Sequence, residues 1–167
     1  MKNKIRVLSL FLVLTVLSVA LSACTSKESA KQGGSGLRIA IVTSPSGVDD
    51  RSFNEDNYNG ILKFIEKNPG ATVQAVREPS GDPAASVQAV ADIVADYDVI
   101  VTPGYQFSGI SSIAAENPDK KFILIDSYPD AVDGKEEFEN IYAMMFAEEE
   151  SGFLAGMAAA LETKTNK

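Results

Sequence analysis

The sequence predicts an α/β fold in which a doubly wound parallel sheet is covered by helices on both faces. Short apolar runs alternate with amphipathic segments from residue 37 onward, and this strand-helix order calls for parallel strands joined by right-handed crossovers. The apolar runs show little polar-apolar alternation, as expected for strands that are buried on both faces. Several runs end in polar loops, two of which contain glycine, and such loops form the usual ligand crevice of this fold.

The first predicted strand is Leu37–Val42, and the first predicted helix is Phe53–Lys67. Ser52 and Glu55 have the spacing of a capping box, so Ser52 is the expected N-cap. Apolar residues then recur along one helix face: Tyr58, Ile61, Leu62 and Ile65. The Asn-Pro-Gly sequence at 68–70 ends the helix.

The remaining elements follow the same order. The expected strands are Thr72–Val76, Asp98–Thr102, Lys121–Asp126 and Ile141–Phe146. One helix begins at Asp82 and Pro83, which supply an N-cap and a first-turn proline. A further helix is expected roughly over Ser108–Asn117, and a long one over Ala147–Leu161, with acidic residues in its first turn.

The amino terminus has the pattern of an exported lipoprotein. Basic residues precede an apolar run over Val7–Leu21, and Leu-Ser-Ala then leads directly into Cys24, the only cysteine. This arrangement resembles the lipobox of bacterial lipoproteins, so residues 1–23 are the expected signal peptide and Cys24 the expected lipid-attachment residue. The alternative is an unpaired cysteine that follows a signal sequence by chance. Residues 24–36 are polar and rich in glycine and serine, which is typical of a flexible tether, and residues 37–167 are the expected folded lobe.

Composition excludes several classes of function. The net charge of −8 becomes −11 when residues 1–23 are removed, which argues against nucleic acid or anionic lipid surfaces as partners. Without histidine and with a single cysteine, the chain lacks most nucleophile-base pairs and transition-metal sites. It also contains no phosphate-loop or dinucleotide motif. The sequence therefore predicts no cofactor, no metal and no enzymatic activity.

Polar and aromatic side chains gather where the predicted strands end. Carboxylates there can accept hydroxyl groups and an aromatic ring can stack on a flat solute, which suits reversible capture. Three alternatives stay open. Phe53 has a structural role under its helix, Asp126 caps the next turn, or Asp50 and Asp126 form the carboxylate pair of a hydrolase. The candidate ligand-binding residues are Ser44, Asp50, Ser52, Phe53, Asn54, Gly104, Tyr105 and Asp126.

The sequence from Val48 to Glu55, followed by Tyr58-Asn59-Gly60, resembles the signature of the basic membrane protein family. These are substrate-binding lipoproteins of ATP-driven importers and include purine nucleoside receptors. Similarity continues through residues 104–107, 117–126 and 140–156. The resemblance implies that Phe53 stacks on the nucleobase, that Asn54 hydrogen-bonds the ligand and that Asp126 lies in the same cleft.

Two departures from the family pattern stand out. Many members carry Asp after the Thr that ends the first strand, whereas this chain has Ser44, a hydroxyl in place of a charged acceptor. Family members also have two lobes in the manner of type I periplasmic binding proteins, and the resemblance covers only the amino-terminal one.

The expected protein is therefore the amino-terminal portion of a nucleoside receptor. The resemblance implies that a lipid holds it on the outer face of the cell membrane, where it delivers solute to an ABC permease and its ATPase. Two alternatives stay open, a receptor of the same fold for a sugar or signal molecule and a surface lipoprotein that acts in adhesion.

Overall fold

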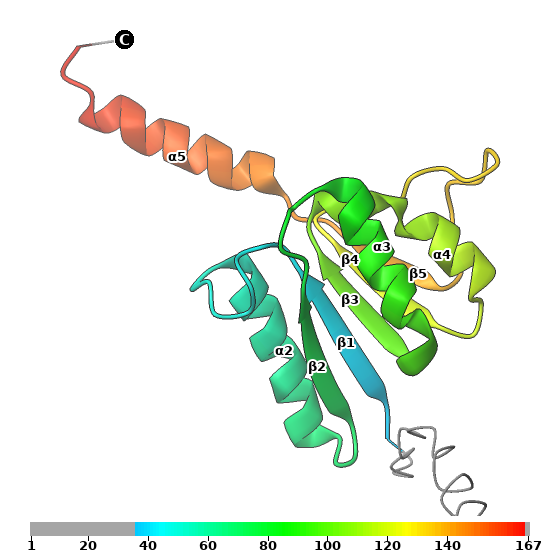
Figure 1. Cartoon of the computed structure of the whole chain (residues 1–167). Helices are drawn as coiled ribbons and strands as arrows, with labels where there is room; N and C mark the ends of the chain where they lie inside the picture. Colours follow the sequence, from blue (N-terminus) through cyan, green and yellow to red (C-terminus); the bar gives the residue numbers. More distant parts are fainter. Residues whose placement is uncertain (1–35, 166–167) are drawn as a thin grey trace, which may run out of the picture. The chain divides into compact units, whose positions relative to one another are not determined.

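A computed structural model of the chain describes residues 36–165 (Figure 1). The expected signal peptide, Cys24 and the tether up to residue 35 lie outside the described residues. The elements in chain order are β1 (Arg38–Thr43), α2 (Phe53–Lys67), β2 (Thr72–Arg77), α3 (Pro83–Ile93), η1 (Val94–Asp96), β3 (Val99–Pro103), η2 (Tyr105–Ile110), α4 (Ser111–Glu116), β4 (Lys121–Ile125), β5 (Ile141–Met144) and α5 (Glu148–Glu162).

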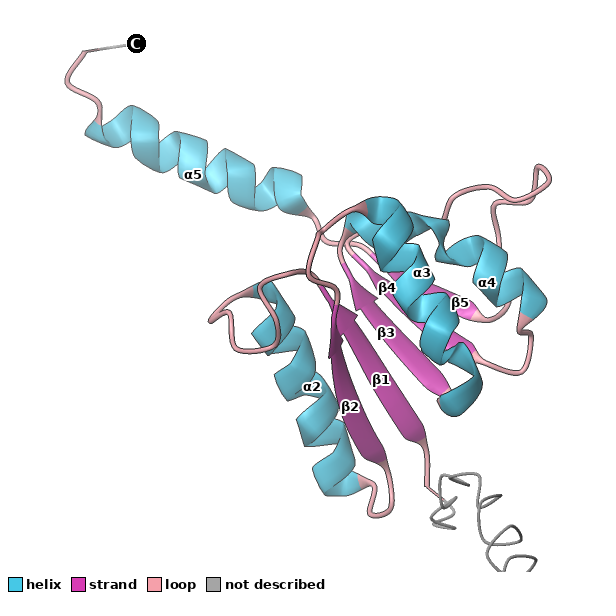
Figure 2. Ribbon diagram, in the orientation of Figure 1, coloured by secondary structure: helices cyan, strands magenta, loops and turns pink. Residues whose placement is uncertain are grey.

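The strands form one parallel sheet in the order β2-β1-β3-β4-β5, which confirms the expected fold class (Figure 2). The chain moves outward from β1 to β2 and then returns to build β3, β4 and β5 on the other side of β1. The strand order thus reverses between β1 and β3. In open parallel sheets this switch point is where the loops separate and leave room for a ligand.

The two faces of the sheet are covered differently. On one face α3, η2 and α4 pack over a core that includes Phe107, Ile110 and Phe122, all fully or almost fully buried. On the other face α2 packs through Ile61 over Ile41 and Val101. Since α2 is the only helix in this second cluster among residues 36–165, the second face is covered over only part of its width.

Two expected boundaries are off by at least two residues. The helix expected over Ser108–Asn117 begins instead as the 3₁₀ helix η2, because Gly104 turns the chain at φ 109° and its carbonyl accepts the Phe107 N–H three residues on. The last strand ends at Met144 rather than Phe146. Its partner β4 ends at Ile125, which pairs with Met144, so the residues beyond have no strand to pair with.

Helix α5 follows β5 with all its residues exposed. Within residues 36–165 no helix combines the length and the hydropathy that a bilayer crossing requires.

Two leucines allow the burial pattern to be tested with the same substitution. Leu124→Ala removes a fully buried side chain from β4 and is expected to lower the free energy of unfolding by about 2–5 kcal/mol. Leu62→Ala on α2, where the side chain is 37% exposed, is expected to cost about 1 kcal/mol or less. Urea unfolding of both variants measures the difference, and equal losses would contradict the placement of the core.

Candidate functional site

The ends of three neighbouring strands meet at one edge of the sheet. Ile41 of β1 pairs with Val101 of β3, so Ser44 and Gly104 lie three residues further on at the same level. Pro103 pairs with Ile125 of β4, which puts Asp126 beside Gly104. The Gly104 N–H donates to the Ile125 carbonyl over 2.8 Å and ties these two strand ends together.

The loop between β1 and α2 is organised by the carboxylate of Asp50. It accepts backbone N–H groups of Ser52 over 2.9 Å, Asn54 over 3.3 Å and Glu55 over 3.1 Å. These are donors that the first turn of a helix leaves without a partner inside the helix. Asp50 therefore performs the capping of α2 and fixes the direction in which the helix leaves the sheet.

This capping arrangement corrects the expected capping box. Ser52 stands at the N-cap position, but its side chain makes no capping hydrogen bond. The Glu55 carboxylate accepts the N–H of Arg51 over 2.8 Å, one residue earlier than the expected partner. Arg51 has φ 55°, a left-handed conformation that is uncommon for a residue other than glycine and that this hydrogen bond helps to hold.

The hydrogen bonds to Asp50 also favour its charged form. Partial burial disfavours the charged carboxylate, but the three backbone donors outweigh it and hold the pKa of Asp50 below its ordinary value. A carboxylate that is engaged in this way and ionised at neutral pH is poorly suited to be a general acid. This argues against the alternative of a hydrolase built on Asp50 and Asp126.

Asn54 and Ser44 form a polar pair at the edge of the sheet. Asn54 is 3% exposed, and its Nδ2 donates to Ser44 Oγ over 2.9 Å. Because the serine hydroxyl accepts this bond, its own proton is free to be donated elsewhere. Asn54 is thus a buried residue that holds Ser44.

The other candidates differ in exposure. Phe53 is half-buried and packs against the apolar cluster under α2. Tyr105 is 76% exposed, and Asp126 is partly buried with a left-handed φ of 61°. The Asp126 N–H donates to the Met144 carbonyl over 2.7 Å, which ties the end of β4 to β5. The structure brings Ser44, Gly104 and Asp126 to one edge, with Phe53 and Asn54 held nearby by Asp50.

Glu78 is a residue of this edge that the sequence analysis missed. It follows β2, is 5% exposed, and accepts the N–H of Ser80 over 2.8 Å and its hydroxyl over 2.7 Å. It also accepts the N–H of Gly81. A Cβ atom placed on Gly81 would lie 3.4 Å from the ring carbons of Pro45. Glu78 therefore orders the Ser80–Gly81 turn, and this turn lies next to Pro45 of the β1 loop. The signal in the sequence was an acidic residue two positions before Ser-Gly.

A family model described as ABC transporter substrate-binding protein PnrA-like matches residues 38–167. The CD4+ T-cell-stimulating antigen of Listeria innocua is 28% identical over 176 aligned residues that cover 100% of this chain and 47% of that protein. The ABC transporter nucleoside-binding protein BmpA of Lactococcus lactis is also 28% identical, over 98% of this chain and 47% of its own length.

Among solved structures, one of the ABC transporter system solute-binding proteins from Aeropyrum pernix K1 aligns with a TM-score of 0.62 and 27% identity. The alignment covers 74% of this chain and 32% of that one. The chain spans about half the length of the curated relatives it matches.

Substitutions at Asp50 and Ser52 separate the two capping schemes. Asp50→Ala leaves three backbone N–H groups without their acceptor and is expected to cost about 1–2 kcal/mol of unfolding free energy. Ser52→Ala, which removes no capping bond, is expected to be nearly neutral. Chemical denaturation at neutral pH measures both, and the reverse order would restore the serine cap.

The contribution of Asp50 also depends on pH. Its pKa is lowered in the folded state, so the stabilisation is present above the unfolded pKa of about 4 and is lost as the pH falls through the folded value. The difference in stability between the parent chain and Asp50→Ala should therefore shrink in acid. A difference that stays constant down to pH 2 would contradict this assignment.

Proposed function

Since the chain belongs to the Bmp family of PnrA-like ABC transporter substrate-binding proteins, we propose that it forms the nucleoside-binding lobe of an importer's receptor. Membership confirms the resemblance noted in the sequence and identifies a substrate-binding protein rather than an enzyme. A relative of the same family is named as a nucleoside-binding protein, which supports the proposed class of solute. An ABC permease and its ATPase are the proposed partners.

The observation that carries the proposal is the placement of Phe53. Phe53 is the first residue of α2, its half-buried ring contacts the apolar cluster under the helix, and the three hydrogen bonds to Asp50 fix the backbone around it. An aromatic ring that is partly ordered in this way can stack on a nucleobase at a reduced entropic cost. In the proposed complex, Phe53 supplies stacking and the strand ends supply polar contacts.

The polar contacts come from two kinds of group. Asp126 contributes a carboxylate that can accept ribose hydroxyls, because no side-chain hydrogen bond within residues 36–165 engages it. Ser44 contributes a hydroxyl that accepts from Asn54 and so offers its proton to an acceptor on the ligand. We assign Asn54 the role of positioning Ser44, a change from the direct ligand contact that the resemblance implies.

Attachment to the membrane is a separate part of the proposal. Cys24 follows an export signal at the position where bacterial lipoproteins are acylated, and more than one acyl chain gives stable anchoring. The polar tether that follows Cys24 would keep the lobe near the permease on the outer face of the membrane. Cys24 lies outside the described residues, so this step rests on sequence alone.

Two phenylalanines of α2 provide a matched test of nucleoside binding. Saturation-transfer NMR on the purified chain, a method that detects millimolar affinities, is expected to show contacts from inosine or guanosine. Phe53→Ala should weaken binding by roughly 5- to 150-fold, the equivalent of about 1–3 kcal/mol for one base stacked on an aromatic ring. Phe64→Ala, on the same helix but away from the carboxyl edge, should leave it unchanged.

Two outcomes would contradict the proposal. Equal effects of the two substitutions would mean that Phe53 does not stack on the ligand. Saturation by ribose at concentrations where nucleosides give no signal would favour the alternative of a sugar receptor.

Lipid attachment is tested by metabolic labelling in a bacterial host. The chain is expected to incorporate labelled palmitate and to fractionate with membranes, and Cys24→Ser should abolish the label and release the protein. Label that persists in Cys24→Ser would show that acylation occurs at a residue other than Cys24.

A further inference from the structure

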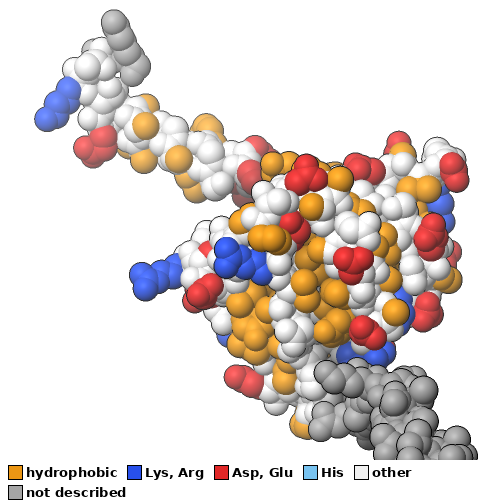
Figure 3. Space-filling view, viewed as in Figure 1, with side chains coloured by type: hydrophobic (Ala, Val, Ile, Leu, Met, Phe, Trp, Pro, Cys, Tyr) orange, Lys and Arg blue, Asp and Glu red, His pale blue; other side chains and the backbone are white. Residues whose placement is uncertain are grey.

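Glu78 is the only charged side chain that is buried among residues 36–165. Acidic side chains are otherwise spread over the surface, as on the face of the molecule shown in Figure 3. Burial of a carboxylate is costly unless groups of the protein replace its hydrogen bonds to water. The carboxylate of Glu78 therefore has to find its hydrogen-bond donors inside the protein.

These donors all come from the turn that follows β2. One carboxylate oxygen of Glu78 accepts both the N–H and the hydroxyl of Ser80, and the other accepts the N–H of Gly81. The Ser80 hydroxyl in turn accepts the N–H of Asp82 over 3.1 Å. The hydrogen bond from the Ser80 hydroxyl, together with those from the backbone, holds the pKa of Glu78 below its ordinary value. The turn is thus built around one ionised carboxylate.

The ordered turn lies against the loop that follows β1. The backbone N–H of Glu78 donates to the Thr43 carbonyl over 3.0 Å, one residue before Ser44. Gly81 approaches the ring of Pro45, one residue after Ser44, so closely that a Cβ atom on Gly81 would be in van der Waals contact with it. Contacts from the end of β2 therefore hold the chain on both sides of Ser44.

The far end of the β1 loop is held by the same segment. The N–H of Gly47 donates to the Ser44 carbonyl over 3.1 Å and closes a turn. Arg77, the last residue of β2, lies beside Gly47, since a Cβ atom placed on this glycine would be 3.8 Å from Arg77 Cδ. Asn54 holds the side chain of Ser44 from α2 over 2.9 Å. The backbone and the side chain of Ser44 are thus fixed from two different elements.

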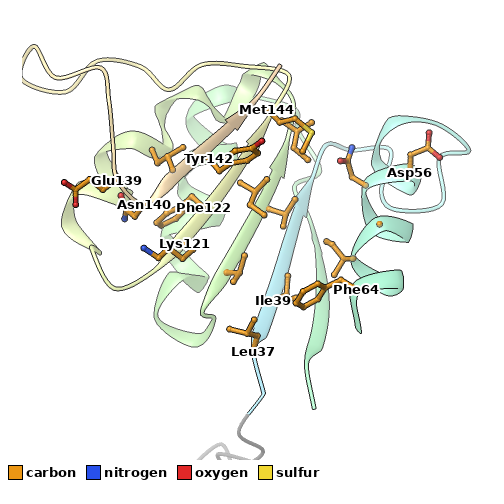
Figure 4. Close-up of a pocket in the computed structure, with 18 residues that line it drawn as sticks. Leu37, Ile39, Asp56, Phe64, Lys121, Phe122, Glu139, Asn140, Tyr142 and Met144 are labelled. Atoms are coloured by element: carbon orange, nitrogen blue, oxygen red, sulfur yellow. The ribbon is translucent and has the colours of Figure 1, made fainter. Parts of the chain in front are cut away.

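The polar groups that this loop carries have no counterpart in the pocket beside α2. That pocket, of about 640 Å³, lies on the second face of the sheet (Figure 4). Mostly apolar side chains such as Ile39, Phe64 and Met144 line it, and none of the candidate ligand-binding residues does. A solute with hydroxyl groups requires convergent polar groups. The order of the β1 loop therefore bears directly on the binding of such a solute.

We propose that Glu78 is a positioning residue of the solute site, which holds the β1 loop through the Ser80–Gly81 turn and so directs the Ser44 hydroxyl toward the solute. This rests on the proposed function, in which Ser44 donates its proton to the ligand. Glu78 acts through Ser44 and not by its own contact, because its side chain is 5% exposed and its oxygens are engaged by the turn. A glutamine would offer one acceptor oxygen where the carboxylate offers two.

Amide hydrogen exchange measured by NMR tests the loop without any ligand. In Glu78→Gln an NH₂ group replaces one acceptor oxygen, so one hydrogen bond of the turn is lost. The N–H of Gly47 is then expected to exchange about tenfold faster. Ser80→Ala removes only an exposed hydroxyl and provides a second variant, which should accelerate exchange of the same amide to a smaller extent.

Asp98→Asn is the matched control for the loss of a carboxylate. Asp98 also accepts three hydrogen bonds, all from Arg38, but at the amino ends of β1 and β3. Its replacement should leave the exchange of Gly47 unchanged. Equal acceleration in Glu78→Gln and Asp98→Asn would show a general loss of stability, and no acceleration in Glu78→Gln would show that the loop is held without the carboxylate. Either result overturns the proposal.

A double-mutant cycle shows whether Glu78 acts through Ser44. NMR titration with inosine gives the dissociation constants of the parent chain, Glu78→Gln, Ser44→Ala and the double variant. Each single substitution should weaken binding about three- to tenfold, the effect of one hydrogen bond, and the double variant should bind no more weakly than Ser44→Ala. Additive effects overturn the proposal. A parent chain that binds neither inosine nor guanosine contradicts the proposed function instead, and the exchange of Gly47 then decides whether Glu78 holds the loop.

Discussion

The β1 side of the sheet's carboxyl edge depends on one carboxylate that accepts three backbone N–H groups. Asp50 satisfies the free donors at the start of α2, and in doing so it fixes the backbone of Phe53 and Asn54. Asn54 then holds Ser44, and Ser44 lies level with Gly104 and Asp126 on the neighbouring strands. This local interaction, which the lowered pKa of Asp50 keeps intact at neutral pH, thus orders the β1 side of the edge, whereas strand pairing holds Gly104 and Asp126 on the other side.

The fold could be predicted because its signals are local and repeated. Apolar runs bounded by turn residues placed each strand to within a few residues, and Asp82 caps α3 as its sequence indicated, through a bond to the Ala85 N–H of 3.0 Å. The errors arose where neighbours in space decide. Strand β5 ends where its partner β4 ends. Asp50 rather than the expected Ser52 caps α2, and this depends on the left-handed turn at Arg51. Neither fact can be found from spacing in one segment.

The site was predictable as a region and less so as a set of roles. Strand ends in a parallel sheet must share an edge, so Ser44, Gly104 and Asp126 could be grouped before their geometry was known. Which polar atom is left for a ligand could not be deduced, because it depends on which side chain already bonds to which. Asn54 uses its amide on Ser44, and Glu78 orders a turn after β2 that the site prediction did not include.

The backbone at Asp126 limits which residues can replace it in the proposed site during evolution. Its φ of 61° is tolerated by Asp, Asn and Gly but disfavoured by longer or branched side chains. A mutation to Asn or Gly would remove the negative charge while leaving the turn unstrained, whereas Glu would retain the charge in a strained backbone. In the proposed site, a change of solute is thus more accessible through loss of this negative charge than through a longer acidic side chain.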